Sequence, residues 1–356
     1  MAAGTPVYPG EYNVYIPNHE STQGMIVDFS RNPKDFSLNK WIKLIPVKTE
    51  NGYYARFGRD GGLPEEAARI TDTALPGAVW HDGNDAPDGN KLKELFQFVE
   101  HHCIRYATPW VLGDKTVAQA SWSIKDQYAR IAAQLAMTRR AQLCISAATT
   151  TGNYPTGHFS AVSSITGVTG KWDVSTSARM DIRRSLDYGA EIIRLDTLGL
   201  VKRKDLRLVI SPGEAMAMSR SQEVIDILKQ QANSIKIIEG TWEQKNFQFP
   251  AELYGVEIVI EDTVKATNAK GATRAVSNIL ADTTAILCSR PEGLEGTDAA
   301  APNFSTITMF AYDQEEMVVE EMHDSRHKRV EGRVIDTVDV QVTAGAAGFL
   351  FTSTTG

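Results

Sequence analysis

Residues 114–150 contain neither glycine nor proline, and this uninterrupted stretch is the feature that most constrains the fold. Apolar residues recur in it at spacings of three and four, which is the pattern of one face of an α-helix. Thr116 and Gln119 fit a capping box at the start of such a helix. A helix of about thirty residues is roughly 45 Å long, so we expect residues 116–148 to form the backbone of an elongated subunit. The predicted apolar stripe consists of Val117, Ala120, Ile124, Tyr128, Ile131 and Leu135.

The stretch that follows the predicted helix reads "TTTGNYPTG" and allows two interpretations. A phosphate-binding loop needs a lysine after its second glycine and a helix behind it. Here His158 stands in the place of the lysine, and the helix comes first. The stretch does contain both signals that end a helix. Gly152 suits the left-handed position after a helix, and Pro155 prevents the helix from resuming. We therefore predict a helix stop with Gly152 in the left-handed conformation.

Composition excludes several classes of protein. The chain has 356 residues, 42% of them hydrophobic and 23% charged, as in an ordinary folded protein. Its net charge of -7 argues against a sequence-reading nucleic-acid binder, which carries a basic patch. The three cysteines lack the paired spacing of a disulfide framework or a zinc ribbon. There is no apolar run of membrane-spanning length and no signal pattern, so we expect no membrane association, and synthesis and use in a cytoplasm.

The region before the long helix predicts an arm and an extended hairpin. Residues 1–38 lack periodicity and are rich in Pro, Gly, Asn and Ser, which favours an extended arm. Strand-like segments read "WIKLIPVKT" and "LFQFVEHHCIRYATPWV", and some forty polar residues separate them. Loops of that length usually carry function. The part "KLKELFQFVEHH" is also compatible with a short helix.

The region after the long helix predicts a small α/β layer followed by strands. An amphipathic helix carries Ile182, Leu186 and Ile193 on one face and has Gly199 near its end. "DLRLVISP" predicts a short buried strand, and Ser211 then caps a helix that reads "EAMAMSRSQEVIDILKQ". Further strands are predicted at "GVEIVIEDT" and "TTAILCSR", and two to four more in the stretch from Ser305 to Val342.

Histidine and cysteine residues offer two candidate reactive sites, each with a structural alternative. His323 and His327 have the spacing of a zinc-binding helix, but the surrounding residues read as strand and turn, where side chains four apart cannot share a metal. Adjacent residues in a strand point to opposite faces, which separates His101 from His102. Cys103 has no orienting group that the sequence can name.

Ser211 and a short basic run offer two more candidates. Ser211 lies at a strand–turn–helix junction, as a nucleophile would, but the G-x-S-x-G pattern is absent and the helix-cap role explains the residue. The run Lys202-Arg203-Lys204 is too short to indicate nucleic-acid binding and predicts a solvated turn. We therefore expect neither an enzyme nor a bound cofactor or metal.

The order of these parts, with "TTTGNYPTG" after the long helix and "YGVEIVIEDT" before the closing strands, resembles the major capsid proteins of tailed phages with the Hong Kong 97 fold. This resemblance covers essentially the whole chain. It implies an α+β fold with five parts: an N-terminal arm (1–38), an extended loop with its supporting strands (39–110), a peripheral domain with a spine helix (111–174), an α/β axial domain (175–302), and strands that close the peripheral domain (303–356).

The resemblance also implies a function. A protein of this family self-assembles as pentamers and hexamers into an icosahedral shell around double-stranded DNA, which it contacts non-specifically. Further partners would be a portal, a decoration protein and a separate scaffolding protein, since the arm begins almost at once. The protein would belong to the virion and be made in the host cytoplasm. The alternatives are an encapsulin-type nanocompartment shell and an α/β hydrolase or metal enzyme that uses Ser211 or His323.

The polar excursion between Tyr53 and Asn90 is the predicted contact surface between subunits. Its segment "ARFGRDGGLPEEAARI" carries both signs of charge, as expected of a surface that pairs with another copy of the chain. Exposed ion pairs contribute only about 0–1 kcal/mol each, too little to fix a hairpin alone. The predicted contact residues are Arg56, Arg59, Asp60, Glu65, Glu66 and Arg69.

Overall fold

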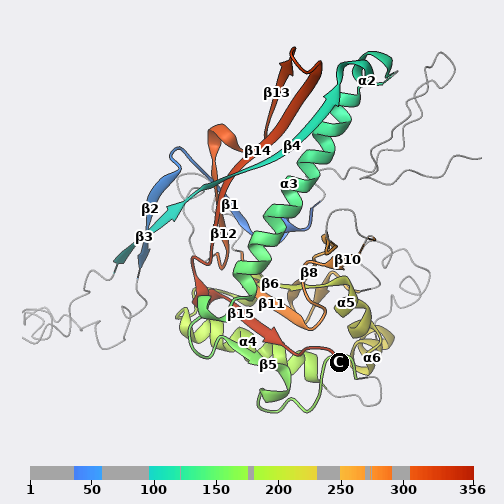
Figure 1. Ribbon diagram of the computed structural model, residues 1–356. Helices are drawn as coiled ribbons and strands as arrows, with labels where there is room; N and C mark the ends of the chain where they lie inside the picture. The colour runs from blue at the N-terminus through green and yellow to red at the C-terminus, as the bar shows by residue number, and fades with distance from the viewer. Residues whose placement is uncertain are drawn as a thin grey trace, which may run out of the picture.

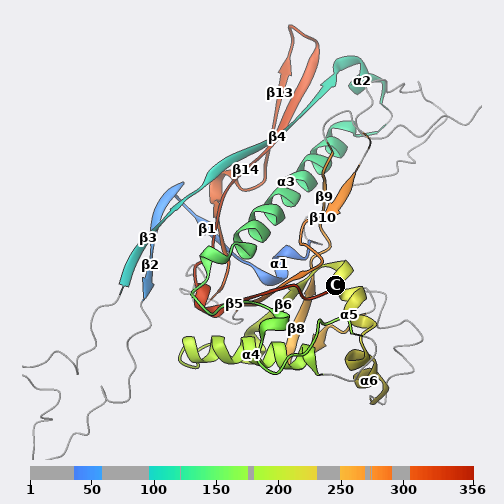
Figure 2. The same cartoon turned by 60° about the horizontal axis from the view of Figure 1, so that its bottom comes forward.

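The computed structural model describes residues 36–57, 96–120, 122–174, 180–230, 249–268, 273, 275–290 and 305–356. These residues form two layers, one above the other in Figure 1, and the long helix α3 (Ile124–Thr149) runs from the far end of the upper layer down to the lower one. The upper layer is a five-stranded sheet, and the lower layer is a six-stranded sheet with helices against it (Figure 2). The molecule is therefore an α+β protein.

The upper sheet has the strand order β1-β12-β14-β13, and β4 pairs with the other edge of β14. The pair β1–β12 is parallel, and the other pairs are antiparallel. Helix α3 covers the face of β4 and β14 that carries Trp110, Leu112, Val330 and Val334. The strands are β1 (Lys43–Val47), β4 (Ile104–Gly113), β12 (Thr308–Tyr312), β13 (Val318–Asp324) and β14 (Arg329–Gln341).

The predicted long helix is divided in two. A short helix α2 (Asp114–Gln119) ends at Ala120, whose backbone is extended, and α3 begins at Ile124. The predicted capping box is wrong, because Thr116 lies inside α2 and Gly113 is the N-cap residue. The aromatic ring of Trp122, half-buried, packs on the cluster below α2 and α3. Tertiary packing thus interrupts a stretch that local sequence would continue as a helix.

The face that α3 buries also differs from the predicted stripe. Ile124 is buried as predicted, but Ile131 and Leu135 are 37% and 54% exposed. The helix instead buries two adjacent rows of residues four apart, and most of these side chains are small. Small side chains allow the helix to approach the sheet closely. The buried residues are Ile124, Ala132, Ala136, Met137, Arg140, Ala141, Cys144, Ile145 and Ala148.

The predicted helix stop is confirmed, but the role of Gly152 in it is wrong. Helix α3 ends at Thr149, Thr150 is extended, and Gly152 lies in a short 3-10 turn without a positive φ. Side chains occupy the last carbonyls instead: the Asn153 amide donates to the Ala147 oxygen and the Tyr154 hydroxyl to the Ala148 oxygen, each at 2.8 Å. These hydrogen bonds replace a left-handed glycine as the termination signal.

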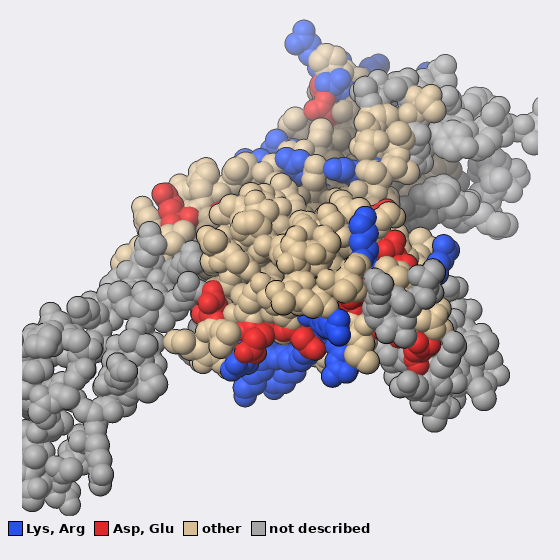
Figure 3. All heavy atoms as spheres, turned by 90° about the horizontal axis from the view of Figure 1, so that it is seen from below, with Lys and Arg blue, Asp and Glu red and all other residues tan. Residues whose placement is uncertain are grey.

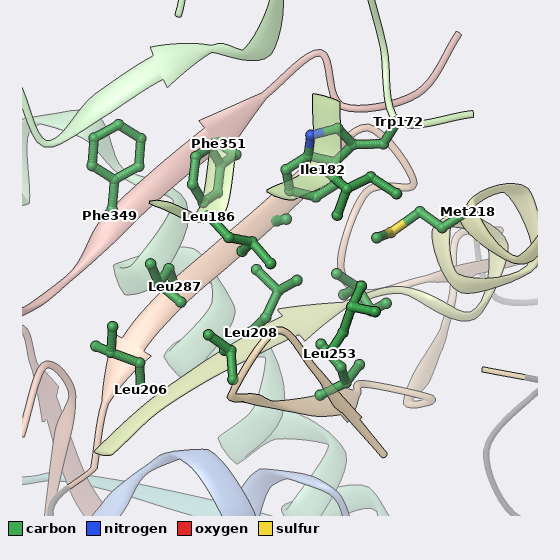
Figure 4. Close-up of a cluster of buried hydrophobic side chains, with 14 of the residues drawn as sticks. Trp172, Ile182, Leu186, Leu206, Leu208, Met218, Leu253, Leu287, Phe349 and Phe351 are labelled. Atoms are coloured by element: carbon green, nitrogen blue, oxygen red, sulfur yellow. The ribbon is translucent and has the colours of Figure 1, made fainter. Parts of the chain in front are cut away.

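The lower sheet has the order β5-β15-β11-β6-β8-β7. Helix α4 (Asp181–Asp196) lies across one face with Ile182, Leu186 and Ile193 buried, as predicted, and Figure 4 shows Ile182 and Leu186 with the leucines and aromatic rings of the strands. The predicted helix after Ser211 forms α5 (Pro212–Ser219) and α6 (Gln222–Gln230). The strands are β5 (Phe159–Ala161), β6 (Leu206–Ile210), β7 (Glu252–Leu253), β8 (Val256–Ile260), β11 (Thr284–Ser289) and β15 (Phe349–Thr352).

The predicted division of the chain does not follow the two layers at two places, around β5 and β15 and near residue 36. Strand β5 and the last strand β15 pair with each other in the lower sheet, whereas the sequence-based division placed residues 111–174 and 303–356 in the peripheral domain. At the other end, Phe36 and Leu38 are buried in the core, although residues 1–38 were assigned to an arm; residues 1–35 lie outside the described part of the chain.

The short helix α1 (Leu38–Trp41) lies where the layers meet. Its side chains join Cys144 of α3 and Cys288 of β11 in one buried cluster. The Trp41 indole N–H donates to the Glu261 carboxylate at 3.1 Å, and the Arg290 guanidinium donates to the Lys40 carbonyl at 2.8 Å. The segment that leads to the N-terminal residues is therefore fixed to both layers.

Two ribbons of two strands each lie outside the larger sheets. One consists of β9 (Val264–Ala266) and β10 (Val276–Asn278). The other consists of β2 (Asn51–Phe57) and β3 (Phe96–His102), which settles the ambiguous stretch "FQFVEHH" as strand. The ribbon β2–β3 projects from the body at the left of Figure 1.

We predict that Gly332→Ala destabilises the subunit. A Cβ atom at Gly332 would overlap the indole ring of Trp110, its partner on β4, so the ring must leave its place between sheet and helix. Overpacking of this kind costs about 1–3 kcal/mol of unfolding free energy, which denaturant unfolding measures. The control is Gly152→Ala, because a Cβ atom there meets nothing within 4 Å. Equal losses in the two variants would contradict this account.

Candidate assembly surface

The ribbon β2–β3 is anchored to the upper sheet by one of its faces. The Tyr54 ring stacks on Phe310 of β12 at 5.4 Å, and the His101 ring lies 4.7 Å from the same ring, centroid to centroid. The Tyr54 hydroxyl donates to Gln341 at 3.1 Å, and the backbone N–H of His102 donates to Asp339 at 3.0 Å. The base of the ribbon is therefore fixed on β12 and β14.

The other face of this ribbon presents two large aromatic side chains to solvent. Tyr53 is 69% exposed and Phe98 is 65% exposed. They are diagonal neighbours on one face, since Tyr53 pairs with Glu100 and Phe98 pairs with Ala55. A two-stranded ribbon is marginally stable alone, and exposed aromatic pairs mark interaction sites. We define Tyr53 and Phe98 as the aromatic face, a candidate contact surface that sequence reasoning did not identify.

The predicted contact residues lie beyond this aromatic face along the chain. The backbone of Arg56 pairs with Gln97 at the outer part of the ribbon. The Arg56 side chain lies outside the described residues, as do Arg59, Asp60, Glu65, Glu66 and Arg69, so their role stays a prediction.

A second apolar surface lies along the exposed side of α3. Ile131 and Leu135 are one helical turn apart and face away from the sheet, and the exposed Arg139 lies one further turn along the same side. The Arg139 guanidinium lies over the Tyr106 ring, 5.1 Å from its centroid. We define Ile131 and Leu135 as the helix stripe. It is apolar, with the basic side chain of Arg139 at one end.

A buried ion pair holds α3 in place beneath the helix stripe. The Arg140 guanidinium donates to both carboxylate oxygens of Asp336 on β14, at 2.8 and 2.5 Å, and to Glu316 at 3.3 Å. Burial alone would lower the pKa of Arg140, but the hydrogen bonds and charges of Asp336 and Glu316 outweigh it and raise the pKa. Arg140 therefore stays charged, and its hydrogen bonds to Asp336 fix the position of α3 on the sheet.

The surface of the lower layer carries mixed charges. Helix α4 has ion pairs between Arg194 and Glu191 at 2.6 Å and between Asp187 and Arg203 at 2.5 Å. Seen from below, acidic and basic side chains lie side by side along one border, and most of the described surface is uncharged (Figure 3). Lys202, Arg203 and Lys204 belong to a turn before β6, in which Arg203 also donates to the Tyr254 carbonyl. On this face the basic side chains gather along the same border as the acidic ones.

The candidate nucleophiles have structural roles. The Ser211 hydroxyl accepts a hydrogen bond from the Glu214 backbone N–H at 3.1 Å and donates one to Asp282 at 2.5 Å, so it caps α5 as predicted. His101 and His102 lie on opposite faces of the ribbon, also as predicted. Burial, with a contribution from the charge of Asp339, raises the pKa of the Cys103 thiol to about 11. The thiolate form of Cys103 is therefore scarce at neutral pH.

Three other histidines of the described residues, His158, His323 and His327, pair with separate carboxylates. His323 on β13 lies 3.1 Å from Asp114, and His327 in the following turn lies 2.6 Å from Asp324. His158 is fully buried, with one ring nitrogen 2.6 Å from Asp196 and the other 2.8 Å from the Gly348 carbonyl. Across the described residues, no group of three or more His, Cys, Asp or Glu side chains is placed to hold a metal ion.

Comparisons with known proteins give no match from sequence. No family model matches the chain, and no curated protein matches it. None of the described helices is both long and apolar enough to cross a membrane.

Solved structures, in contrast, match nearly the whole chain. A phage-related protein of Bordetella bronchiseptica RB50 aligns over 90% of this chain and 93% of its own, with a TM-score of 0.59 and 16% identity. The capsid of the cyanophage P-SCSP1u aligns over 98% and 92%, with a TM-score of 0.51 and 11% identity. The capsid of a native GTA particle aligns over 98% and 97%, with a TM-score of 0.51 and 13% identity. The fold is that of the Hong Kong 97-type phage capsid proteins, which confirms the resemblance and the α+β class.

We predict that Arg140→Met severely destabilises the subunit. The change leaves the Asp336 carboxylate buried without its cation, which costs about 3–5 kcal/mol, measured by denaturant unfolding. The neighbouring change Arg139→Met removes an exposed guanidinium and a cation–π contact, worth about 1 kcal/mol or less. The double variant Arg140→Met with Asp336→Leu should recover most of the loss. A double variant as unstable as the single one would show that the pair itself, and not the stranded charge, sets the cost.

Proposed function

We propose that this chain is a major capsid protein that assembles as pentamers and hexamers into an icosahedral shell around double-stranded DNA. The observation that carries the proposal is the extent of the fold match: capsid subunits align with 98% of the chain, including the projecting ribbon and both layers. A fold matched over part of its length would leave room for an added catalytic domain. Here the match covers essentially the whole chain, which supports a shell-forming role.

Two unlike surfaces support assembly by contacts between different parts of neighbouring copies. The aromatic face lies on a ribbon that points away from the body, whereas the helix stripe lies along the body (Figures 1 and 2). Contacts between unlike patches propagate, and they close into rings at particular rotations. Glu100 lies beside Tyr53 on the ribbon, and Arg139 lies one turn beyond Leu135 of the helix stripe, so the charges next to the two surfaces have opposite signs. We infer that the aromatic face of one copy packs on the helix stripe of the next.

The charged segment beyond the ribbon extends this contact in the proposal. Arg56, Arg59, Asp60, Glu65, Glu66 and Arg69 carry both signs of charge, so they can pair with a neighbouring copy once the aromatic face has docked. Because exposed ion pairs contribute about 0–1 kcal/mol each, these residues act as a closing contact and the aromatic rings supply most of the buried area.

The remaining partners follow from the shell function. A separate scaffolding protein would direct curvature, a portal would occupy one vertex, and a decoration protein could attach outside. A net charge of -7 limits retention of DNA on the wall, because affinity for phosphates comes from Lys and Arg. The protein would be made in the host cytoplasm and act in the virion. Under this proposal the chain is a structural protein, and Ser211, Cys103 and His323 have structural and not catalytic roles.

The first test is electron microscopy of the purified protein, co-expressed with a scaffolding protein. We expect closed hollow particles of discrete sizes, because ring closure permits only certain rotations. Nucleic acid inside native particles would support the phage shell, and a dedicated cargo enzyme would support the encapsulin-type alternative. Light scattering that shows only the 39.1 kDa monomer at high concentration would overturn the proposal.

The second test addresses the aromatic face. We predict that the double variant Tyr53→Ser with Phe98→Ser yields folded subunits that no longer form closed particles, since both rings are exposed in the subunit and contribute little to its own core. Thermal unfolding of the subunit should hardly change. The matched control is Tyr53→Phe, which keeps the ring and should assemble.

The third test addresses the charged segment. Deleting residues 58–66 should leave a folded subunit, with thermal unfolding close to that of the full chain, that fails to form closed particles. Normal assembly of this deletion variant would reject the role of the segment, and failure to fold would place it in the core.

A further inference from the structure

Residues 353–356, which follow β15, form a strap held between two loops of the lower layer. The Thr354 backbone N–H donates to the Thr283 carbonyl at 3.1 Å. The Thr354 carbonyl accepts from the backbone N–H of Trp172 at 2.8 Å. The Thr355 hydroxyl donates to the Asp282 carbonyl at 2.6 Å, and its own carbonyl accepts from the Lys171 amine at 3.1 Å. The strap therefore bridges the loop before β11 and the loop at Lys171.

A buried carboxyl group lies beneath this strap. Glu214, the third residue of α5, has an exposed fraction of 0%, and neither of its carboxylate oxygens has a hydrogen-bond partner that satisfies normal geometry. The Thr354 hydroxyl lies beside it and is buried as well. A buried carboxylate without partners is costly, whereas a neutral carboxyl group in the same place is tolerated.

The charged group that faces Glu214 is another carboxylate. Asp282 accepts from the Ser211 hydroxyl at 2.5 Å and from the Asn278 amide at 3.1 Å, and it lies so close to Gly213 that a Cβ atom there would be 2.5 Å from its Cγ. Asp282 thus occupies the favourable anion position at the start of α5. Two charged residues also contact the strap: the Lys171 amine donates to the Thr355 carbonyl, and the Asp173 carboxylate accepts from the Gly356 N–H.

The environment of Glu214 favours its neutral form. Burial raises its pKa from 4.5 to about 8; the charge of Asp282 adds to the rise, and hydrogen bonding by Thr354 and Ser211 opposes it. Because no cation is among the groups that act on the Glu214 carboxyl next to Asp282, we expect ionisation of Glu214 to require that water reach it. The strap, Ser353-Thr354-Thr355-Gly356, contains no hydrophobic residue and is held by the hydrogen bonds given above.

We propose that Glu214 is a latch that keeps the strap docked while its carboxyl group is protonated and releases residues 353–356 when it ionises. The geometry supplies each part: an enclosed carboxyl group, a fixed anion next to it, and a short segment above it that is held by a few hydrogen bonds. This device belongs to the subunit itself and does not depend on the proposed shell function.

The latch has a defined pH dependence. Opening returns Glu214 to water, where its pKa is ordinary, so the open form loses a proton that the closed form keeps. Stability of the closed strap is then complete below the open-state pKa of 4.5 and falls until the pH passes the closed-state value of about 8. Over that range the opening constant rises about tenfold for each pH unit, and it is constant above it.

Hydrogen exchange of the Thr354 amide tests the latch, because this N–H is bonded only when the strap is docked. In the full chain, its protection factor should fall about tenfold per pH unit between about pH 5 and 8 and then level off. Glu214→Gln, which cannot ionise, should show the same protection at every pH. The matched control Glu252→Gln removes an exposed carboxylate of the same layer and should follow the wild type.

Two outcomes overturn the latch: a wild-type protection factor that does not depend on pH, and a Glu214→Gln variant that keeps the wild-type slope. If Glu214→Gln does not fold, the wild-type profile still decides, together with Asp282→Asn. Removing the negative charge of Asp282 should move the upper end of the sloping range to lower pH. An unmoved upper limit would show that Asp282 does not act on Glu214.

Discussion

The buried cluster around Trp41 joins the two layers of the subunit, and the position of every other element depends on it. Side chains of α1, the lower half of α3 and both sheets enter one apolar core, so neither layer can move without exposing part of it. Arg140 extends this constraint upward, because its bidentate pair with Asp336 fixes α3 on β14. The aromatic face and the helix stripe are therefore presented by a rigid frame, as the proposed contact between them requires.

Much of the fold could be predicted from the sequence, because local signals agreed with the tertiary structure. Periodicity identified the buried face of α4, and Ser211 was recognisable as a cap from Ser-Pro-Gly-Glu alone. The order of arm, hairpin, long helix and α/β layer then indicated the capsid fold although sequence identity to the aligned structures is at most 16% among the three described. Element order persists where individual side chains have diverged.

The errors arose where tertiary packing overrules local preference. Nothing in "ASWS" signals a break, yet the chain leaves the helix there and Trp122 packs on the core. The stripe that included Ile131 and Leu135 has helical spacing, but spacing alone cannot show whether an apolar side chain faces the core or another molecule. Tyr53 and Phe98 were missed because their ribbon carries aromatic residues on both faces. The available signal was that neighbouring residues of a strand point to opposite faces: if Tyr54 packs on the sheet, Tyr53 must face away from it.

Strand β14 gives the upper layer a particular mechanical character. It is hydrogen-bonded along one edge to β4 and along the other to β13 and then β12, and its ladder with β4 runs without interruption from Arg329 to Val338. A pull directed along such a strand loads all of these hydrogen bonds together in shear, whereas a pull across it would open them one after another. The blade formed by β4, β13 and β14 is thus stiff to tension along its length, and Arg140 transfers that tension to the helix that runs beside it.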